Sequence, residues 1–229
     1  MEEKIQNEIE KGNKFKKICI ILFVAVCLAF ITLVLIVILG PREEIVNAKP
    51  IIYLYPTEET EINVELKNKD KITCSYPKYK DKWQVIANPN GDLLDTETGR
   101  NLYSLYYESK VVKDYKIEED GFVVKGGEVS EFLQEKLAIL GLNERETEEF
   151  IIYWLPKLES NKYNYIRFAT TEEIETNMPL IITPKPDTTI RIIMTFKGLD
   201  KPMQVKEQKL EKVERDGFVA VEWGGSEIK

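Results

Sequence analysis

Residues Ile18–Leu39 read ICIILFVAVCLAFITLVLIVIL and contain no charged side chain. Seventeen of these 22 residues are Leu, Ile, Val or Phe, and each such residue favours membrane insertion by about 0.3–0.6 kcal/mol. A helix of this length measures about 33 Å, enough to cross a hydrocarbon core of about 30 Å. The stretch predicts a transmembrane helix over residues 18–40, with the lipid bilayer as its partner.

A cleaved signal peptide is the competing interpretation of this segment. Such a peptide has an apolar core of about 7–15 residues, followed by small residues at the cleavage site. Here the core is longer, and it ends in Ile38-Leu39-Gly40-Pro41, with bulky side chains where small ones are needed. We therefore expect the segment to be retained as an uncleaved signal-anchor.

Basic residues are more frequent before the segment than after it. Five lysines precede it, namely Lys4, Lys11, Lys14, Lys16 and Lys17. Only Arg42 and Lys49 follow it closely. Because basic flanks remain cytoplasmic, we expect a single-pass protein of the cell membrane. Residues 1–17 form its cytoplasmic tail, 41–48 a juxtamembrane linker and 49–229 an extracytoplasmic domain.

The predicted membrane helix carries a small-xxx-small pair, Ala25 and Ala29, with Thr32 further along the same face. Pairs of this type let two helices approach closely, which makes a weak homodimer one hypothesis. Ordinary alanines in a lipid-facing helix are the alternative.

Composition excludes several functional classes. The chain has no histidine, so neither an imidazole general base nor a histidine-ligated metal is available to it. Beyond Gly40 there are 27 basic and 35 acidic residues, a net charge of −8 that disfavours nucleic acid as a partner. Cys74 is the one cysteine outside the apolar segment. We interpret it as a half-buried strand residue, with an intermolecular disulfide or a reactive thiol as alternatives.

The region after Lys49 alternates in the way typical of strands. KPIIYLYP (49–56) has the composition of a buried strand, and EINVELK (61–67) alternates apolar with polar residues. Together they predict a hairpin over residues 50–67. ITCSY, WQVIA, Leu93-Leu94 and LYSLYYE predict an antiparallel meander with turns at NPNG and TETG, and DGFVVK predicts a further strand. YNYIRFA and DGFVAVEW predict two more strands, and MPLIITP with TTIRIIMTF a second hairpin.

Two helices interrupt the strands. Val129, Phe132, Leu133 and Leu137 recur at helical spacing and predict a helix over 128–140, which Gly141 ends. Asn143 with Glu146 is a capping signal and predicts a second helix over 144–155, before Pro156. The predicted fold class is α+β, with one N-terminal transmembrane helix followed by a mainly antiparallel β ectodomain that contains an inserted helix pair.

Two pairs of similar segments suggest an internal duplication. PIIYLYP followed by TEINVEL resembles PLIITP followed by TTIRIIM, and DGFVVKGGE resembles DGFVAVEWGGSE. The two offsets differ, so chance reuse of strand and turn residues is the alternative.

No residue is assigned a catalytic, cofactor-binding or metal-binding role. Asn88, Asn90 and Asp92 have part of the spacing of a calcium loop, but the residues that must follow are absent, which favours a plain turn. Asp92 and Asp95 are candidates for a pair of hydrolytic acids, but their odd spacing in a strand sends the two side chains to opposite faces. The acidic groups at 118–120 and 172–175 are interpreted as a solvated turn and as loop or helix-start residues. Arg167 and Arg191 are expected to be exposed on strands, opposite the apolar side chains.

The segments KPIIYLYP (49–56), NERETEEFIIYWLP (143–156) and RIIMTFKGLDKP (191–202) resemble a group of uncharacterised bacterial membrane-anchored proteins, which also share PKPDTTIR-like sequence (184–191). The likeness covers most of Lys49 to Trp223. It implies a recurrent bacterial module without a known activity, so no site residue is carried over.

The resulting hypothesis is an extracytoplasmic binding module for another envelope protein or a surface polymer. Eleven tyrosines and three tryptophans lie outside the apolar segment, and exposed rings of this kind can stack on sugars. The alternatives are an envelope enzyme that uses carboxylate, tyrosine or lysine chemistry and a single-pass signalling protein. Binding predicts an exposed aromatic patch, whereas catalysis predicts a pocket in which at least two acids converge.

Overall fold

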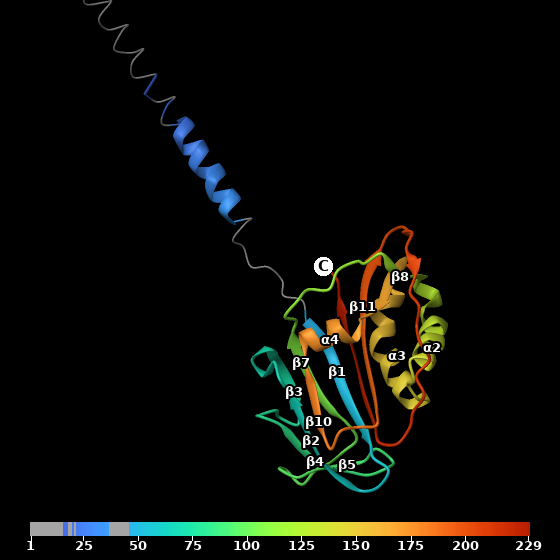
Figure 1. Cartoon of the computed structure of the whole chain (residues 1–229). Helices are drawn as coiled ribbons and strands as arrows, with labels where there is room; N and C mark the ends of the chain where they lie inside the picture. Colours follow the sequence, from blue (N-terminus) through green and yellow to red (C-terminus); the bar gives the residue numbers. More distant parts are fainter. Residues whose placement is uncertain (1–15, 18–19, 21, 37–45) are drawn as a thin grey trace, which may run out of the picture. The chain divides into compact units, whose positions relative to one another are not determined.

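The computed structural model describes residues 16–17, 20, 22–36 and 46–229 (Figure 1). The chain divides into two units, Met1–Glu43 and Glu44–Lys229. Residues 22–36 of the first unit are helical, and the Thr32 hydroxyl donates to the Ala29 carbonyl oxygen at 2.8 Å. None of the described helices combines the length and apolarity needed to cross a membrane. Most of the predicted tail, both ends of the predicted span and linker residues 41–45 lie outside the described residues.

The second unit contains a mainly antiparallel sheet of eight strands. Its spatial order is β12 (Lys206–Glu207), β8 (Asp120–Lys125), β9 (Tyr163–Phe168), β11 (Thr188–Leu199), β13 (Val219–Glu227), β1 (Val46–Tyr55), β7 (Leu105–Lys110) and β3 (Ile72–Tyr76). Parallel pairing occurs between β11 and β13 and between β12 and β8. Strand β1 begins at Val46, ahead of the expected start of the folded domain at Lys49.

A second, antiparallel sheet of five strands packs on one face of the first. Its order is β10 (Leu180–Thr183), β2 (Thr60–Leu66), β4 (Trp83–Ala87), β5 (Leu93–Asp95) and β6 (Asn101–Leu102). The core between the sheets joins side chains of both, such as Ile52 and Leu54 from β1 with Ile62 and Val64 from β2.

Helices α2 (Val129–Ile139) and α3 (Glu144–Glu159) cover the other face of the large sheet (Figure 1). Ile51 and Tyr53 of β1 belong to this second core, together with Phe150 and Trp154 of α3. Strand β1 is therefore covered on both faces, which explains why KPIIYLYP lacks an alternating polar pattern. Two 3₁₀ turns (Lys69–Lys71 and Gly126–Glu128) and the short helix α4 (Thr171–Asn177) complete the domain. The fold is α+β with mainly antiparallel sheets.

Both predicted hairpins are wrong. Strand β1 pairs with β13 and β7, whereas β2 lies in the other sheet beside β10 and β4. The second predicted hairpin likewise divides, with β10 in the small sheet and β11 in the large one. An alternating pattern shows that one face of a strand is buried but does not identify the sheet that buries it. The meander is correct for β4, β5 and β6, but β3 and β7 pair in the large sheet.

The strand arrangement also contradicts the duplication suggested by the similarity of PIIYLYP–TEINVEL to PLIITP–TTIRIIM. That alignment equates β1 with β10 and β2 with β11. Strands β1 and β11 belong to the large sheet, while β2 and β10 belong to the small one, so each proposed equivalent lies in the opposite sheet. Short strand and turn segments of similar composition explain the resemblance.

The predicted helix pair is confirmed, with one correction at its end. Asn143 and Glu146 form the expected capping box, and the Asn143 side chain accepts from the Glu146 N–H at 2.9 Å. Helix α3 does not stop before Pro156 but continues to Glu159. Proline at this position leaves the Ile152 carbonyl without its usual intrahelical donor. Because Ile152 is exposed, water can satisfy that oxygen, and the helix tolerates the proline.

Candidate functional site

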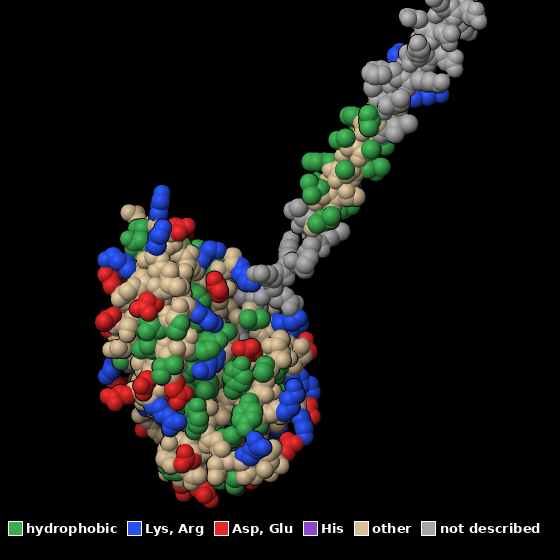
Figure 2. Space-filling model, turned by 180° about the vertical axis from the view of Figure 1, so that it is seen from behind, with side chains coloured by type: hydrophobic (Ala, Val, Ile, Leu, Met, Phe, Trp, Pro, Cys, Tyr) green, Lys and Arg blue, Asp and Glu red, His purple; other side chains and the backbone are tan. Residues whose placement is uncertain are grey.

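A hollow of about 500 Å³ lies where the first part of β1 meets β3, β7 and α3. It is lined by four tyrosines together with Lys49, Ile51, Asn101, Leu102 and Ser104, the tyrosines being Tyr76, Tyr103, Tyr106 and Tyr153. Two of the rings remain open to solvent, since Tyr76 is 51% and Tyr103 44% exposed. Figure 2 shows hydrophobic side chains gathered among charged ones across the middle of one face of this unit.

Lys49 occupies an irregular position on β1. Its φ of 52° is the one positive value among the described residues other than glycine. The register of β1 shifts between Ala48 and Ile51 in its pairing with β13, and between Asn47 and Ile51 in its pairing with β7. A backbone conformation of this kind costs about 1–3 kcal/mol and is concentrated at functional sites. The irregularity re-aims the lysine side chain relative to a regular strand.

The Lys49 ammonium lies among aromatic rings. Its Nζ atom is 4.7 Å from the centroid of the Tyr153 ring and 5.5 Å from that of Trp223. Burial lowers the pKa of Lys49 below its ordinary value, and the nearby Glu149 carboxylate partly opposes this shift. The hollow therefore presents a partly desolvated cation beside ring faces.

Helix α3 fixes the neighbouring rings through Glu149. The Tyr53 hydroxyl donates to Glu149 Oε2 at 2.6 Å, and Arg145 Nε donates to Glu149 Oε1 at 3.1 Å. Burial, followed by the hydrogen bond to Glu149, raises the pKa of Tyr53. The Arg145 guanidinium in turn lies 4.6 Å from the centroid of the Tyr103 ring. These contacts hold the exposed Tyr103 ring in place through one of its two faces.

The remaining rings are also held at their hydroxyl ends. Arg100 donates to the Tyr76 hydroxyl at 3.4 Å, and Lys157 donates to that of Tyr153 at 3.3 Å. Burial raises the pKa of Tyr106, and its hydrogen bond to Glu108 adds to the shift. The Tyr106 phenol is therefore neutral at pH 7. The arrangement can stack flat groups on ring faces and attract a negative charge to Lys49.

The calcium-like spacing at 88–92 forms a turn. The Asn88 N–H donates to the Asp92 carbonyl oxygen at 2.9 Å, and the Asp92 N–H donates to Asn90 Oδ1 at 3.0 Å. Asp95 is buried and accepts from the Glu97 N–H at 3.3 Å, whereas Asp92 is exposed. No group of three or more potential metal ligands occurs in the described part of the chain. The two aspartates do not converge.

The expected exposure of the two strand arginines is wrong. The side chain of Arg167 is largely buried and binds Asp120 at 2.9 Å and Glu173 at 2.8 Å. Arg191 is still more enclosed, with a side chain only 7% exposed, and its partners are Glu222 and Glu175. Each face of these strands is covered, so the arginines need acidic partners. The acidic groups at 118–120 and 172–175 supply three of those partners.

Cys74 also differs from its expected position. It is exposed, because β3 is the outer strand of the large sheet at this end. The sequence shows abundant tyrosine but no pattern that groups the four tyrosines of the hollow. Tyr103 and Tyr106 lie in one short run of the sequence, whereas Lys49, Tyr76 and Tyr153 are separated from it by tens of positions in the chain.

Comparison of the chain with protein-family models, curated protein sequences and solved structures gives no match.

Proposed function

We propose that this chain is a membrane-anchored extracytoplasmic binding module, and that the tyrosine-lined hollow binds a ring of an acidic surface polymer, such as a uronic-acid sugar. The observation that carries the proposal is the set of open tyrosine rings around Lys49. Ring faces pack against the carbon face of a sugar, and the ammonium attracts a carboxylate.

The composition of the hollow favours binding over carboxylate catalysis. The described residues that line it include one lysine and no aspartate or glutamate. Glu149, whose charge acts on the pKa of Lys49, accepts hydrogen bonds from Tyr53 and Arg145 and serves to position them. A pair of acids acting on a substrate would have to converge on the same space.

The binding proposal predicts which side chains control affinity. Full-length protein in lipid nanodiscs should bind oligogalacturonate, with Tyr76→Ala and Tyr103→Ala each weakening binding about tenfold, which corresponds to about 1.4 kcal/mol. Tyr103→Phe should retain most of the affinity, because the ring face remains. Lys49→Met should reduce the preference for the acidic oligosaccharide over a neutral one. Isothermal titration calorimetry measures each affinity.

Tyr163→Ala serves as the matched control, because Tyr163 lies on β9 and does not line the hollow. Equal weakening by Tyr163→Ala and Tyr103→Ala would contradict the assignment, as would full affinity after both tyrosines of the hollow are removed.

The sidedness of the membrane anchor has a direct test at Cys74. This thiol is exposed, and the other two cysteines, Cys19 and Cys27, lie within the apolar segment. A membrane-impermeant maleimide should label the protein on intact cells, and Cys74→Ser should abolish that labelling. Alkaline washing should leave the labelled chain in the membrane fraction. Labelling that requires cell lysis, or a mature chain that starts beyond Gly40, would contradict the proposal.

A further inference from the structure

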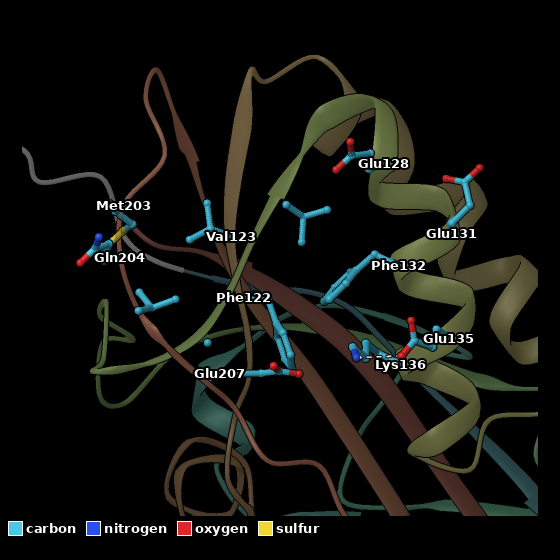
Figure 3. A pocket seen from close by; sticks show the side chains of 13 residues that line it. Phe122, Val123, Glu128, Glu131, Phe132, Glu135, Lys136, Met203, Gln204 and Glu207 are labelled. Atoms are coloured by element: carbon cyan, nitrogen blue, oxygen red, sulfur yellow. Dashed lines mark hydrogen bonds and ion pairs between the residues drawn. The ribbon is translucent and has the colours of Figure 1, made fainter.

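A second hollow, of about 580 Å³, lies along the edge of β8 (Figure 3). One wall is α2, and the other is the chain segment 203–207, which includes Met203, Val205 and Glu207. The Phe122 and Phe132 rings pack edge to face with centroids 5.1 Å apart and form its apolar base. The tyrosine-lined hollow shares none of these residues.

Strand β8 has a free edge beside this hollow. On one side β8 pairs with β9 from Phe122 to Lys125. On the other side β12 pairs only with Asp120 and Gly121, and beyond that point no strand of the described chain adjoins β8. The backbone beside the hollow is therefore paired on one side.

The hydrogen bonds of β12 show which backbone groups face the free edge. The Lys206 N–H donates to the Glu119 carbonyl oxygen at 2.9 Å, and the Gln208 N–H donates to that of Gly121 at 3.2 Å. Successive residues of a strand direct their backbone groups to opposite sides. Val123 and Lys125 therefore direct N–H and C=O groups outward, over about 7–10 Å of strand. Such an edge is a template for a further strand.

Charge around the hollow selects the kind of strand that fits. Four glutamates line it, namely Glu128, Glu131 and Glu135 on the α2 side and Glu207 on the opposite side. Lys136 is the one basic residue in the lining, and its ammonium lies 5.2 Å from the centroid of the Phe122 ring and binds Glu135 at 2.9 Å. The lining thus has an excess of negative charge around an apolar base.

We propose that the edge of β8 binds an extended, lysine- or arginine-rich segment of a partner protein, which adds to the large sheet as a further strand. Backbone hydrogen bonds to Val123 and Lys125 align the segment. Its apolar side chains contact Phe122 and Phe132, and its basic side chains approach Glu131 and Glu207. A second copy of this chain is a poor occupant, because it would bring the same glutamates to the interface.

The probe for this proposal is the peptide acetyl-KVKVKVK-amide, tested against the full-length protein in lipid nanodiscs. We expect measurable binding that weakens with added salt. Acetyl-EVEVEVE-amide should not bind. Glu131→Lys combined with Glu207→Lys should weaken binding of the basic peptide at least tenfold. Fluorescence anisotropy of the labelled peptide measures the affinities.

Backbone pairing is tested by changing the peptide as well as the protein. In the peptide, either the odd-numbered or the even-numbered residues direct their N–H groups toward β8. N-methylation of one of these two sets should abolish binding, because it removes the donors that face β8. Val123→Pro should have the same effect, since it removes an outward N–H on an edge strand, where proline is tolerated. Tyr103→Ala should leave peptide binding unchanged, which separates this site from the tyrosine-lined hollow.

Three outcomes would overturn the proposal. The first is peptide binding that is insensitive to N-methylation of either set, which indicates charge attraction without strand addition. The second is unchanged affinity after the double glutamate reversal. The third is self-association of the wild-type protein that Val123→Pro abolishes in analytical ultracentrifugation, which would assign the edge to a second copy.

Discussion

Replacing Arg191 with alanine is expected to lower the free energy of unfolding by about 3–5 kcal/mol, because the change leaves a buried carboxylate without its cation. The Arg191 Nε–H donates to Glu222 Oε2 at 2.5 Å, and Glu222 is 1% exposed. The Tyr107 hydroxyl donates to the other oxygen of the same carboxylate at 2.6 Å. Arg191 also donates to the Met178 carbonyl oxygen at 2.8 Å and pairs with Glu175. Urea unfolding of the wild type and the variant measures the difference.

Arg167→Ala is the matched control for this substitution. Arg167 also lies on a central strand and has two acidic partners, but both Asp120 and Glu173 are partly exposed and can be rehydrated. Its loss should cost clearly less than the loss of Arg191. The combined variant Arg191→Met, Glu222→Leu and Tyr107→Phe should recover much of the lost stability, because it removes the buried polar side chains of the cluster and leaves only the partly exposed Glu175. Equal losses for Arg191→Ala and Arg167→Ala would contradict the argument.

Trp223→Ala should also lower the free energy of unfolding by about 3–5 kcal/mol, the usual cost of removing a large buried ring. Trp223 is fully buried on β13, with ring centroids 5.3 Å from Phe150 and 6.4 Å from Tyr53. It thereby joins the large sheet to α3. It also lies beside Lys49, so the cavity left by alanine should weaken oligogalacturonate binding as well as stability. Chemical unfolding and calorimetry measure the two effects.

Trp223→Phe tests whether the ring or its polar group matters. The Trp223 Nε1–H has no hydrogen-bond partner among the described residues. Phenylalanine removes this buried donor while keeping an aromatic ring, so its cost should be a small part of the cost of alanine. A loss as large as that of alanine would show that the ring volume is not what stabilises this part of the core.

The sequence alone does not predict either hollow, because the residues that line each one come from separate parts of the chain. Tyr103 and Tyr106 are close in the chain, and the abundance of tyrosine in the sequence predicts an exposed aromatic surface. Lys49 and Tyr153 join them only because β1 and α3 pack together. The free edge of β8 is likewise invisible in the sequence, since it depends on β12 ending after two residues. Neither hollow leaves a local motif, because its members come from separate elements.

The errors in strand pairing have the same origin. Every strand offers similar backbone donors and acceptors, so neighbouring segments such as β1 and β2 can pair with each other or with distant partners. Arg191 lies between Ile190 and Ile192, and this alternation of polar and apolar residues predicts an exposed arginine. The sequence pattern contained no sign that α4 and β7 would enclose its face of the sheet.

The sequence by itself determined the local structure: the helix pair with the Asn143–Glu146 capping box, most strands, and the charge-free segment at 18–39. These depend on spacing and on contacts a few residues apart, which can be read along the chain. The tertiary structure alone decided the assignment of strands to two sheets, the burial of Arg191 and the position of Lys49 among tyrosines. Those features depend on contacts between segments far apart in the chain, whose partners are selected only when the whole core packs.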